Sequence, residues 1–437
     1  MDLSGKLQTG DFVVLAEIMP PKGTAVEPMM AAAAQLSGHV DALVVTDMSG
    51  AMMRMSALGA AALLQKNATD TVLEMGCRDR NRLALQADLL AASAHGITNL
   101  LVGKAEDLAR GDHHQAKPVF DLQPLDLLDA VRSLQQGRDM AGGELSGSPR
   151  FLVGAAVGDV FLPRALPAEV DEIHRMADRG AAYFVTPPLF DMESIRPLLQ
   201  KVKGEGLKII PTVLLLKSVG MARYIAAHID RIRIPPEVIE RIQNAEDAAQ
   251  ECIRIAAQTI SRLREEGFSG ALLSMLGWEA RVQEVVGTEE TAFGGGTAAT
   301  HRERARKEEA MSKRKRILVV DDEPDFVSVV RTNLEKAGFT VETAFDGMEA
   351  LRKIEKDPPD AIVLDVMMPE KDGYSVCATL KADKRFSGIP VLLLTAVAEH
   401  VTSTRYTHYD GMVMEADDYL AKPASAEQII DRLNRLL

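Results

Sequence analysis

The stretch RILVVDDEPDF (316–326) decides the fold of the C-terminal part of this chain. An apolar run of strand length ends in two aspartates, and a helical pattern follows. Four more apolar runs alternate with helical patterns after it, at 341–344, 361–366, 391–395 and 419–420. Five such alternations predict a small parallel α/β sandwich of the flavodoxin-like kind, with its site at the carboxyl ends of the strands.

Polar side chains stand where that site is expected. Five of them follow or end four of the apolar runs: Asp321, Asp322, Asp365, Thr395 and Lys422. Carboxylates gathered this closely repel one another unless a cation offsets them, so a Mg²⁺ site is the economical explanation. A hydroxyl and an ammonium beside an aspartate nucleophile can bind the oxygens of a transferred phosphoryl group.

In this order, these residues resemble the response-regulator receiver family from about Arg316 to Leu437. The resemblance implies that Asp365 accepts a phosphoryl group. It also implies that Asp322 and Asp365 bind Mg²⁺ together with the carbonyl of Met367, while Asp321 assists through water. A sensor histidine kinase or a phosphotransfer protein is the implied partner.

The same resemblance makes Thr395 and Tyr419 a switch pair and Lys422 the phosphate-sensing cation. Thr395 and Tyr419 stand farther apart than the family leads us to expect, with the extra residues in 399–415. Lys422 precedes Pro423, and this peptide bond is a candidate for the cis form.

The N-terminal part carries eight further apolar runs that alternate with helical patterns. The predicted strands are Phe12–Met19, Ala42–Met48, Thr71–Cys77, Asn99–Gly103, Phe151–Gly158, Tyr183–Phe190, Lys208–Leu216 and Ala271–Leu276. The predicted helices include Arg82–Ala94, Leu125–Gln136, Ala168–Arg179 and Ala245–Glu266. This count predicts a (β/α)8 TIM barrel. A doubly wound sheet is the alternative, although its usual glycine-rich nucleotide turn is missing.

Glu17 is the leading candidate for a catalytic group in the barrel. It alternates in phase with Val13 and Leu15, so its side chain is expected to point inward. A buried carboxyl is costly unless it is paired or used, and burial raises its pKa toward the range of a general acid. The alternative is an ion pair with Lys22 or a neighbouring strand.

The barrel segment resembles the methylenetetrahydrofolate reductase family over about residues 10–286. The motifs that carry the likeness are AEIMPPK (16–22), VVTD (44–47), CRDRNRLALQADLL (77–90), GITN (96–99), VFD (119–121) and TPPLFD (186–191). The family implies a barrel that holds FAD and passes a hydride to methylenetetrahydrofolate. It assigns Glu17 as the acid and Thr46, Asp47 and Glu106 to the cofactor.

Several positions differ from the family's pattern. Glu74 replaces a histidine, Ala105-Glu106 a Gly-Asp pair, Gly158-Asp159 an Asn-Pro pair, Met176 a phosphate-binding lysine and Pro187 a folate-contacting glutamine. Losing a cation at a diphosphate weakens anion binding. Three interpretations stay open. The barrel is a flavin-dependent folate oxidoreductase under phosphorylation control, or a scaffold or regulatory subunit in a complex of one-carbon metabolism, or a bystander tethered to a receiver that acts on a separate protein. Redox or C1-metabolism subunits are candidate partners in the first two cases.

The predicted organisation is a barrel at 1–287, a flexible linker at 288–315 and a receiver at 316–437. The linker combines a Gly-, Thr- and Ala-rich stretch with a run of mixed charge. A net charge of −13 and 4% aromatic residues argue against nucleic acid as a partner. Neither a signal peptide nor an apolar run of membrane length is evident, so we expect a cytoplasmic protein without a membrane partner.

Overall fold

The computed structural model describes residues 2–67, 70–202, 204–229, 232–287, 314–395 and 415–437. Almost all of the predicted linker, and the extra residues expected between Thr395 and Tyr419, fall outside these ranges. Within the described residues, no helix is both long and apolar enough to cross a membrane.

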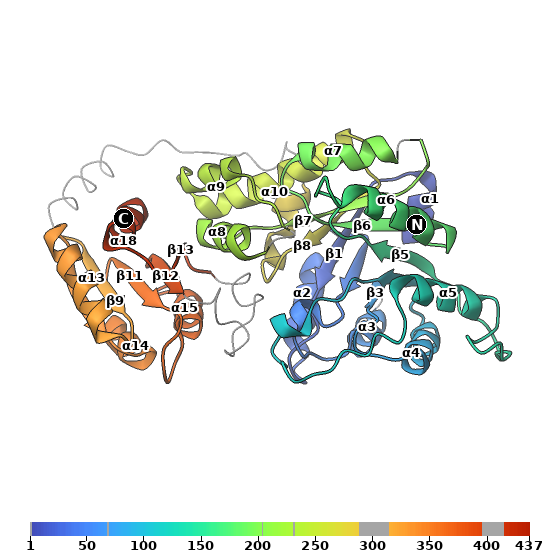
Figure 1. The fold of residues 1–437 in the computed structure, drawn as a ribbon, viewed down its shortest axis with the longest axis horizontal. Helices are drawn as coiled ribbons and strands as arrows, with labels where there is room; N and C mark the ends of the chain where they lie inside the picture. The colour runs from blue at the N-terminus through green and yellow to red at the C-terminus, as the bar shows by residue number, and fades with distance from the viewer. Residues whose placement is uncertain (1, 68–69, 203, 230–231, 288–313, 396–414) are drawn as a thin grey trace. The chain divides into compact units, whose positions relative to one another are not determined.

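The first sheet is a closed barrel of eight parallel strands (Figure 1). In chain order they are β1 Val13–Ile18, β2 Ala42–Val45, β3 Thr71–Met75, β4 Asn99–Val102, β5 Leu152–Ala156, β6 Tyr183–Pro188, β7 Ile209–Leu214 and β8 Gly270–Ser274. Each strand pairs with its sequence neighbours, and β8 returns to β1. The predicted TIM barrel is therefore confirmed, and the open sheet is excluded.

Helix α1 precedes the first strand of this part of the chain, and the other helices follow strands in the sequence. They are α1 Leu3–Thr9, α2 Glu27–Leu36, α3 Ala57–Gln65, α4 Arg82–Ala94, α5 Pro124–Gln135, α6 Leu166–Asp178, α7 Met192–Lys201, α8 Val219–His228, α9 Pro236–Gln243, α10 Ala248–Glu265 and α11 Val282–Val286. Helix α4 begins where the sequence predicts it, because the Asn81 side chain accepts the N–H groups of Leu83 and Ala84.

Alternation along the strands separates two apolar layers. Inward side chains such as Leu15, Val44, Val72 and Leu272 form the central core of the barrel. Their neighbours face the helices. Four polar residues continue the inward series at the carboxyl ends of β1, β2, β3 and β8: Glu17, Thr46, Glu74 and Ser274. The barrel's site is built on this layer.

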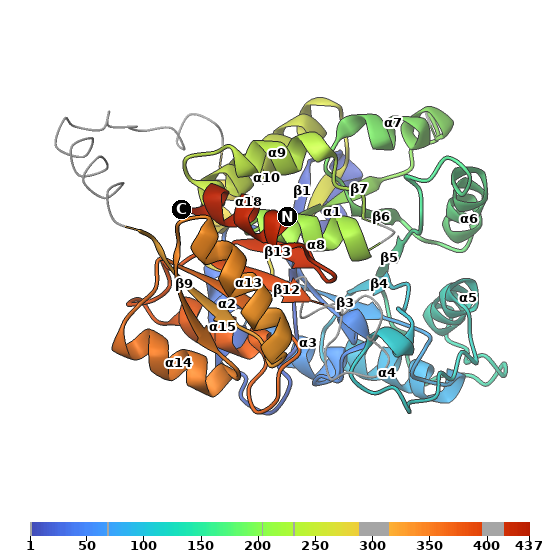
Figure 2. The ribbon, with the colours of Figure 1, turned by 60° about the vertical axis from the view of Figure 1, so that its left-hand side comes forward.

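The second sheet has five parallel strands in the order β10-β9-β11-β12-β13. Its strands are β9 Arg316–Val320, β10 Thr340–Ala344, β11 Ala361–Asp365, β12 Val391–Thr395 and β13 Asp418–Ala421. Helices α13 Pro324–Lys336 and α18 Ala426–Leu436 supply one core, and α14 Gly347–Lys356 and α15 Gly373–Ala382 supply the other (Figure 2). The predicted flavodoxin-like fold is confirmed.

The chain divides into two compact units. The first contains the eight barrel strands, and the second contains the five-stranded sheet and its helices. Two segments that precede the second sheet in sequence, Leu216–Ile229 with helix α8 and Ile239–Glu251, also belong to the second unit.

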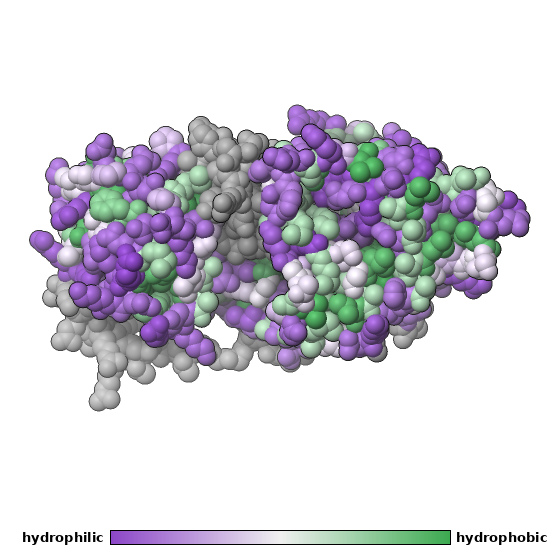
Figure 3. Space-filling model, turned by 90° about the horizontal axis from the view of Figure 1, so that it is seen from below, coloured by the Kyte–Doolittle hydropathy of each residue, from purple (hydrophilic) through white to green (hydrophobic). Residues whose placement is uncertain are grey.

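The described surface keeps some large apolar side chains in contact with solvent. The most exposed of them are Leu83, Val329, Met53, Val119 and Phe120. On the face drawn in Figure 3, hydrophobic residues are interrupted by hydrophilic ones. Scattered apolar residues of this kind are ordinary on a protein surface and need no partner to explain them.

Candidate functional site

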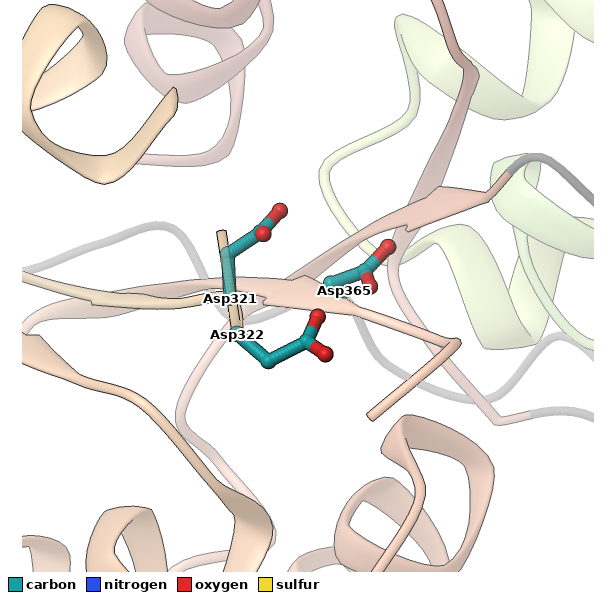
Figure 4. A group of neighbouring side chains, drawn as sticks. All are labelled: Asp321, Asp322 and Asp365. Carbon is teal, nitrogen blue, oxygen red and sulfur yellow. The ribbon is translucent and has the colours of Figure 1, made fainter. Parts of the chain in front are cut away.

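Three carboxylates gather at one edge of the five-stranded sheet (Figure 4). Asp321 and Asp322 follow β9, and Asp365 is the last residue of β11, the neighbouring strand. Each offers an oxygen that lies within 4.8 Å of the others. Asp321 and Asp365 are buried while Asp322 is exposed, so the group is open to solvent on one side.

Lys422 directly follows β13, and its ammonium contacts two of these carboxylates. Its Nζ lies 2.7 Å from Asp321 and 3.0 Å from Asp365. Its backbone N–H donates to the carbonyl of Thr395 at the end of β12, over 2.8 Å. The Lys422–Pro423 peptide bond is cis. The structure thus brings Asp321, Asp322, Asp365, Thr395 and Lys422 to one sheet edge.

The electrostatics of this edge favour a bound cation. Burial raises the pKa of Asp365 to about 7, Lys422 opposes the shift, and Asp321 and Asp322 add to it. Burial lowers the pKa of Lys422, but its bonds to the two buried aspartates outweigh that effect and the net shift is upward. A hard cation with carboxylate oxygen ligands would offset the repulsion, so this donor set fits Mg²⁺.

The backbone after β11 approaches Asp365 closely. A Cβ atom at Gly373 would lie 2.1 Å from the carbonyl oxygen of Asp365, so this position requires a glycine. Asp372 caps α15 by accepting the N–H of Ser375. The loop that carries Met367 is therefore anchored at both ends. The metal-binding role of the Met367 carbonyl stays a prediction.

In the barrel, Glu17 is half-buried near the carboxyl end of β1. Its carboxyl hydrogen-bonds Ser274 on β8, and burial raises its pKa above the ordinary value. Lys22 binds Asp112 instead, with 2.6 Å between Nζ and Oδ2. The ion pair between Glu17 and Lys22 that the sequence left open is therefore not formed.

Glu74 adds a second half-buried carboxyl to this layer. Its Oε2 accepts the backbone N–H of Asp47 over 3.1 Å. Burial raises the pKa of Glu74 to about 8, and the charges of Asp47, Glu17 and Glu106 add to the shift. A Cβ at Gly103 would lie 2.4 Å from Oε1 of Glu74, so the carboxyl fills the space that this glycine leaves.

Asp47 is tied into a charged network. It accepts the N–H of Gly76 over 2.9 Å and pairs with Arg80, which also reaches Asp88. Burial raises the pKa of Asp47, and Arg80 opposes the shift. Asp47 therefore has partners within the protein already, which leaves it little capacity to bind a cofactor.

Thr46 and Glu106 border the remaining space. Thr46 is 3% exposed, and its hydroxyl has no hydrogen-bond partner among the described residues. Glu106 lines a cavity of about 510 Å³ after β4 together with Arg78, Lys117 and Phe120. Phe120 adopts a positive φ of 41°, which is rare for an aromatic residue. Such strain is frequent in binding loops.

Comparison with known families agrees with this architecture. The model of the family described as methylenetetrahydrofolate reductase matches residues 3–288. The chain belongs to the methylenetetrahydrofolate reductase family. A second model, the response regulator receiver domain, matches residues 317–434. The barrel of this reductase family is thus followed by a receiver domain, and receiver domains take their phosphoryl group from histidine kinases or phosphotransfer proteins.

Individual relatives match the receiver domain. PhoP of Bacillus subtilis, the alkaline phosphatase synthesis transcriptional regulatory protein, is 44% identical over 28% of this chain and 48% of its own length. Response regulator MprA of Mycobacterium ulcerans is 45% identical over 28% and 50%. The structure of CheY4 of Vibrio cholerae is 31% identical, covers 29% of this chain and all of its own, and gives a TM-score of 0.26. The chain spans about half the length of the curated relatives it matches.

The reductase family implies FAD, and the residues present fit its diphosphate poorly. A diphosphate needs cations or donors, yet three of the cations near the strand ends, Arg78, Arg80 and Lys104, bind carboxylates of the protein. Arg78 binds Asp79 and the carbonyl of Glu106, and Arg80 binds Asp47. The unpartnered hydroxyl of Thr46 would suit a ligand, but it carries no charge.

Lys104 also binds carboxylates of the protein. It stands directly after Gly103 at the end of β4, and its Nζ lies 3.1 Å from Glu169 and 3.8 Å from Glu172. Met176, at the position of the family's lysine, is 1% exposed and packs in the core. It offers no donor to a phosphate.

Sequence reasoning missed Ser274 and Lys104 as members of the barrel's site. Ser274 lies two residues after Leu272 on β8, so alternation along that strand could have placed it inside. Lys104 follows a glycine at a strand end, which was the available signal. Its pairing with Glu169 could not be read from the sequence, because that contact joins the end of β4 to α6.

Proposed function

We propose that this protein is a phosphorylation-responsive member of its reductase family and that Asp365 accepts the phosphoryl group. The observation that carries the proposal is the meeting of three carboxylates and Lys422 at one sheet edge. In this proposal Asp322, Asp365 and the carbonyl of Met367 hold Mg²⁺, and Asp321 assists through water. The proposed barrel extends over 1–287, the linker over 288–315 and the receiver over 316–437.

The transfer follows from these positions. A carboxylate oxygen of Asp365 forms a bond to phosphorus while the bond from phosphorus to the donor's histidine nitrogen breaks, and that nitrogen keeps the electron pair. The ammonium of Lys422 and the hydroxyl of Thr395 bind phosphoryl oxygens as charge builds on them. Mg²⁺, when bound, neutralises phosphoryl charge at the same edge.

Acetyl phosphate tests this step without the cognate kinase. Incubation with acetyl phosphate and Mg²⁺, followed by reduction with labelled borohydride and peptide mass analysis, should locate the label at Asp365. Chelation with EDTA should remove the labelling. A label that maps to another residue, or that survives EDTA at full extent, would refute the assignment.

For the barrel, we propose a regulatory role in a complex of one-carbon metabolism, without tightly held FAD. The paired states of Arg78, Arg80 and Lys104 support this proposal, since FAD would have to displace their carboxylates. Loss of one charged hydrogen bond in a binding site costs about 1.5–3 kcal/mol, or roughly ten- to hundredfold in affinity. Glu17 keeps the inward, half-buried position expected of a proton donor.

Flavin content distinguishes the reductase interpretation of the barrel from the regulatory one. The purified protein should show no flavin absorption band, and added FAD should bind weakly. Removing the competing carboxylates in Glu169→Gln/Glu172→Gln should strengthen FAD binding, whereas the exposed control Glu144→Gln should not. Stoichiometric FAD in the purified protein, with methylenetetrahydrofolate turnover that Glu17→Gln abolishes, would instead establish an active reductase.

A further inference from the structure

Helix α8 contacts strand β13 within the second compact unit. In its first turn, a Cβ at Gly220 would lie 2.9 Å from the carbonyl oxygen of Ala416 and 3.1 Å from the backbone of Asp418. The N–H of Gly220 donates to the carbonyl of Asp417 over 3.3 Å. A glycine at this position thus lets the helix lie directly on the backbone at the start of the strand.

A buried ion pair reinforces this contact. The side chain of Asp418 is 4% exposed and pairs with Arg223, the fifth residue of α8. Arg223 also donates to Gln243 over 2.6 Å, while Arg432 approaches the other oxygen of Asp418 at 3.7 Å. A buried carboxylate that loses its partner is strongly unfavourable, so Arg223 and Asp418 hold α8 and β13 together.

Aromatic residues complete the contact. Tyr419 is 5% exposed; its hydroxyl hydrogen-bonds a ring nitrogen of His228, and its ring meets Tyr224 edge-on with centroids 5.4 Å apart. Tyr224 is a member of the apolar cluster that the receiver builds on this face of its sheet. Burial raises the pKa of Tyr419 to about 12 and lowers that of His228, so neutral groups share the hydrogen bond.

Tyr419 connects this contact to the phosphorylation edge. β12 and β13 pair in parallel, with Leu393 opposite Tyr419 and Thr395 opposite Ala421. Leu393 and Tyr419 belong to one cluster, and side chains alternate along a strand, so Thr395 and Tyr419 lie on the same face. A ring bonded to His228 and packed on Tyr224 is not free to follow a movement of Thr395 toward a phosphoryl group.

We propose that α8 is an intramolecular ligand of the receiver, held on β13 by Gly220, Arg223 and His228, and that its docking and phosphorylation of Asp365 oppose each other. The opposition rests on the proposed role of Asp365, whereas the docking does not. Coupling between two sites is reciprocal, so releasing α8 should favour phosphorylation by the same factor by which phosphorylation releases α8.

Hydrogen exchange of the unphosphorylated full chain tests the docking alone. Arg223→Ala and His228→Ala should raise amide exchange in 219–228 and 418–421. Ala227→Gln on the exposed side of α8, and His39→Ala on the barrel, should not. Circular dichroism checks that each variant is folded, and His228→Gln, which keeps a hydrogen-bonding group, should restore part of the protection. Unchanged exchange in the folded Arg223 and His228 variants would overturn the proposal.

Beryllofluoride with Mg²⁺ tests the opposition. In the natural protein it should raise exchange in 219–228, and Asp365→Asn should abolish that response. Arg223→Ala and His228→Ala should bind beryllofluoride three- to tenfold more tightly, the range set by one or two lost hydrogen bonds. Beryllofluoride bound at Asp365 with no change in α8 would overturn the opposition while leaving the phosphoacceptor intact. No binding at Asp365 would overturn the phosphoacceptor and the opposition together, but not the docking.

Discussion

The receiver and the barrel each hold a cluster of carboxyl side chains, and the two clusters differ in what surrounds them. At the receiver edge, Asp321 and Asp365 lie against the ammonium of Lys422 and beside exposed Asp322. In the barrel, the carboxyl of Glu17 hydrogen-bonds Ser274, and that of Glu74 accepts the backbone N–H of Asp47. The neighbouring cation, Arg80, pairs with the side chain of Asp47. Lys422 opposes the rise that burial causes in the pKa of Asp365, whereas the charges of Asp47 and Glu106 add to the rise in the pKa of Glu74.

This difference in environment separates their chemistry. An ionised carboxylate can attack phosphorus and bind a metal, and an open side lets both enter. A buried carboxyl that keeps its proton near neutral pH can give it to a ligand but repels anions once it ionises. Hence the receiver edge suits phosphoryl transfer, while the barrel layer suits proton donation and disfavours a diphosphate.

The largest effect that would separate the two groups is expected from Asp365→Asn. An amide cannot form the acyl phosphate, so labelling by acetyl phosphate should disappear. Glu74→Gln in the barrel should leave labelling unchanged, and Asp383→Asn on the receiver surface serves as the matched control. Phosphorylation is followed by mass analysis of the intact protein. If Asp365→Asn were labelled as fully as the natural protein, Asp365 would not be the phosphoacceptor.

Asp322→Ala should have the next largest effect, because it removes a metal ligand but keeps the nucleophile. We expect the rate of labelling at fixed Mg²⁺ to fall roughly ten- to hundredfold, which is the usual loss when a residue that helps to hold a metal is removed. Raising the Mg²⁺ concentration should recover part of the rate, which it cannot do in Asp365→Asn. A variant with the natural Mg²⁺ dependence would show that Asp322 is not a ligand.

These two predictions rest on what the sequence specifies best. The receiver motif could be read directly, since Asp321, Asp365 and Lys422 follow apolar runs whose order fixes where the strand ends meet. The barrel strands were likewise visible from alternation, and so was the inward position of Glu17. The helices Leu125–Gln136 and Ala168–Arg179 were predicted within two residues of α5 and α6.

Side-chain pairings between distant elements could not be predicted. The bond between Glu17 and Ser274 joins the first and last strands, and closure of the barrel alone brings them together. The contacts of Arg223 and His228 were hidden for the same reason, because α8 reads as one more barrel helix. Local sequence patterns predict where strands lie and which side chains point inward, whereas these contacts depend on how the helices and strands pack.

Glu74→Gln probes the barrel group with a smaller effect. The pKa of Glu74 is raised in the folded protein to about 8. Above its ordinary pKa the unfolded chain therefore ionises while the folded barrel keeps the proton, and stability falls as pH rises toward 8. Glutamine resembles the protonated acid, so the variant should unfold several degrees higher at pH 8 and about equally at pH 4.5.

The single tryptophan, Trp278, lies in the barrel part and reports its unfolding by fluorescence. Glu144→Gln is the control, because its side chain is 81% exposed and should show no pH-dependent gain. A Glu74→Gln variant that is less stable than the natural protein at pH 8 would mean that Glu74 is ionised in the fold. The contrast with the receiver aspartates would then fail.

Ser274→Ala should give the smallest change and tests how the barrel holds Glu17. Ser274 is 6% exposed, and its hydrogen bond lowers the pKa of Glu17 against the larger effect of burial. Without it the pKa of Glu17 should rise further, and the barrel should lose about 1 kcal/mol of unfolding free energy, the usual worth of one such bond. Denaturant unfolding followed by Trp278 measures the loss, with exposed Ser146→Ala as control. Because the lost bond favours the ionised form of Glu17, the destabilisation should grow with pH as that form becomes populated. A loss that is equal at all pH values would show that Ser274 only fills space.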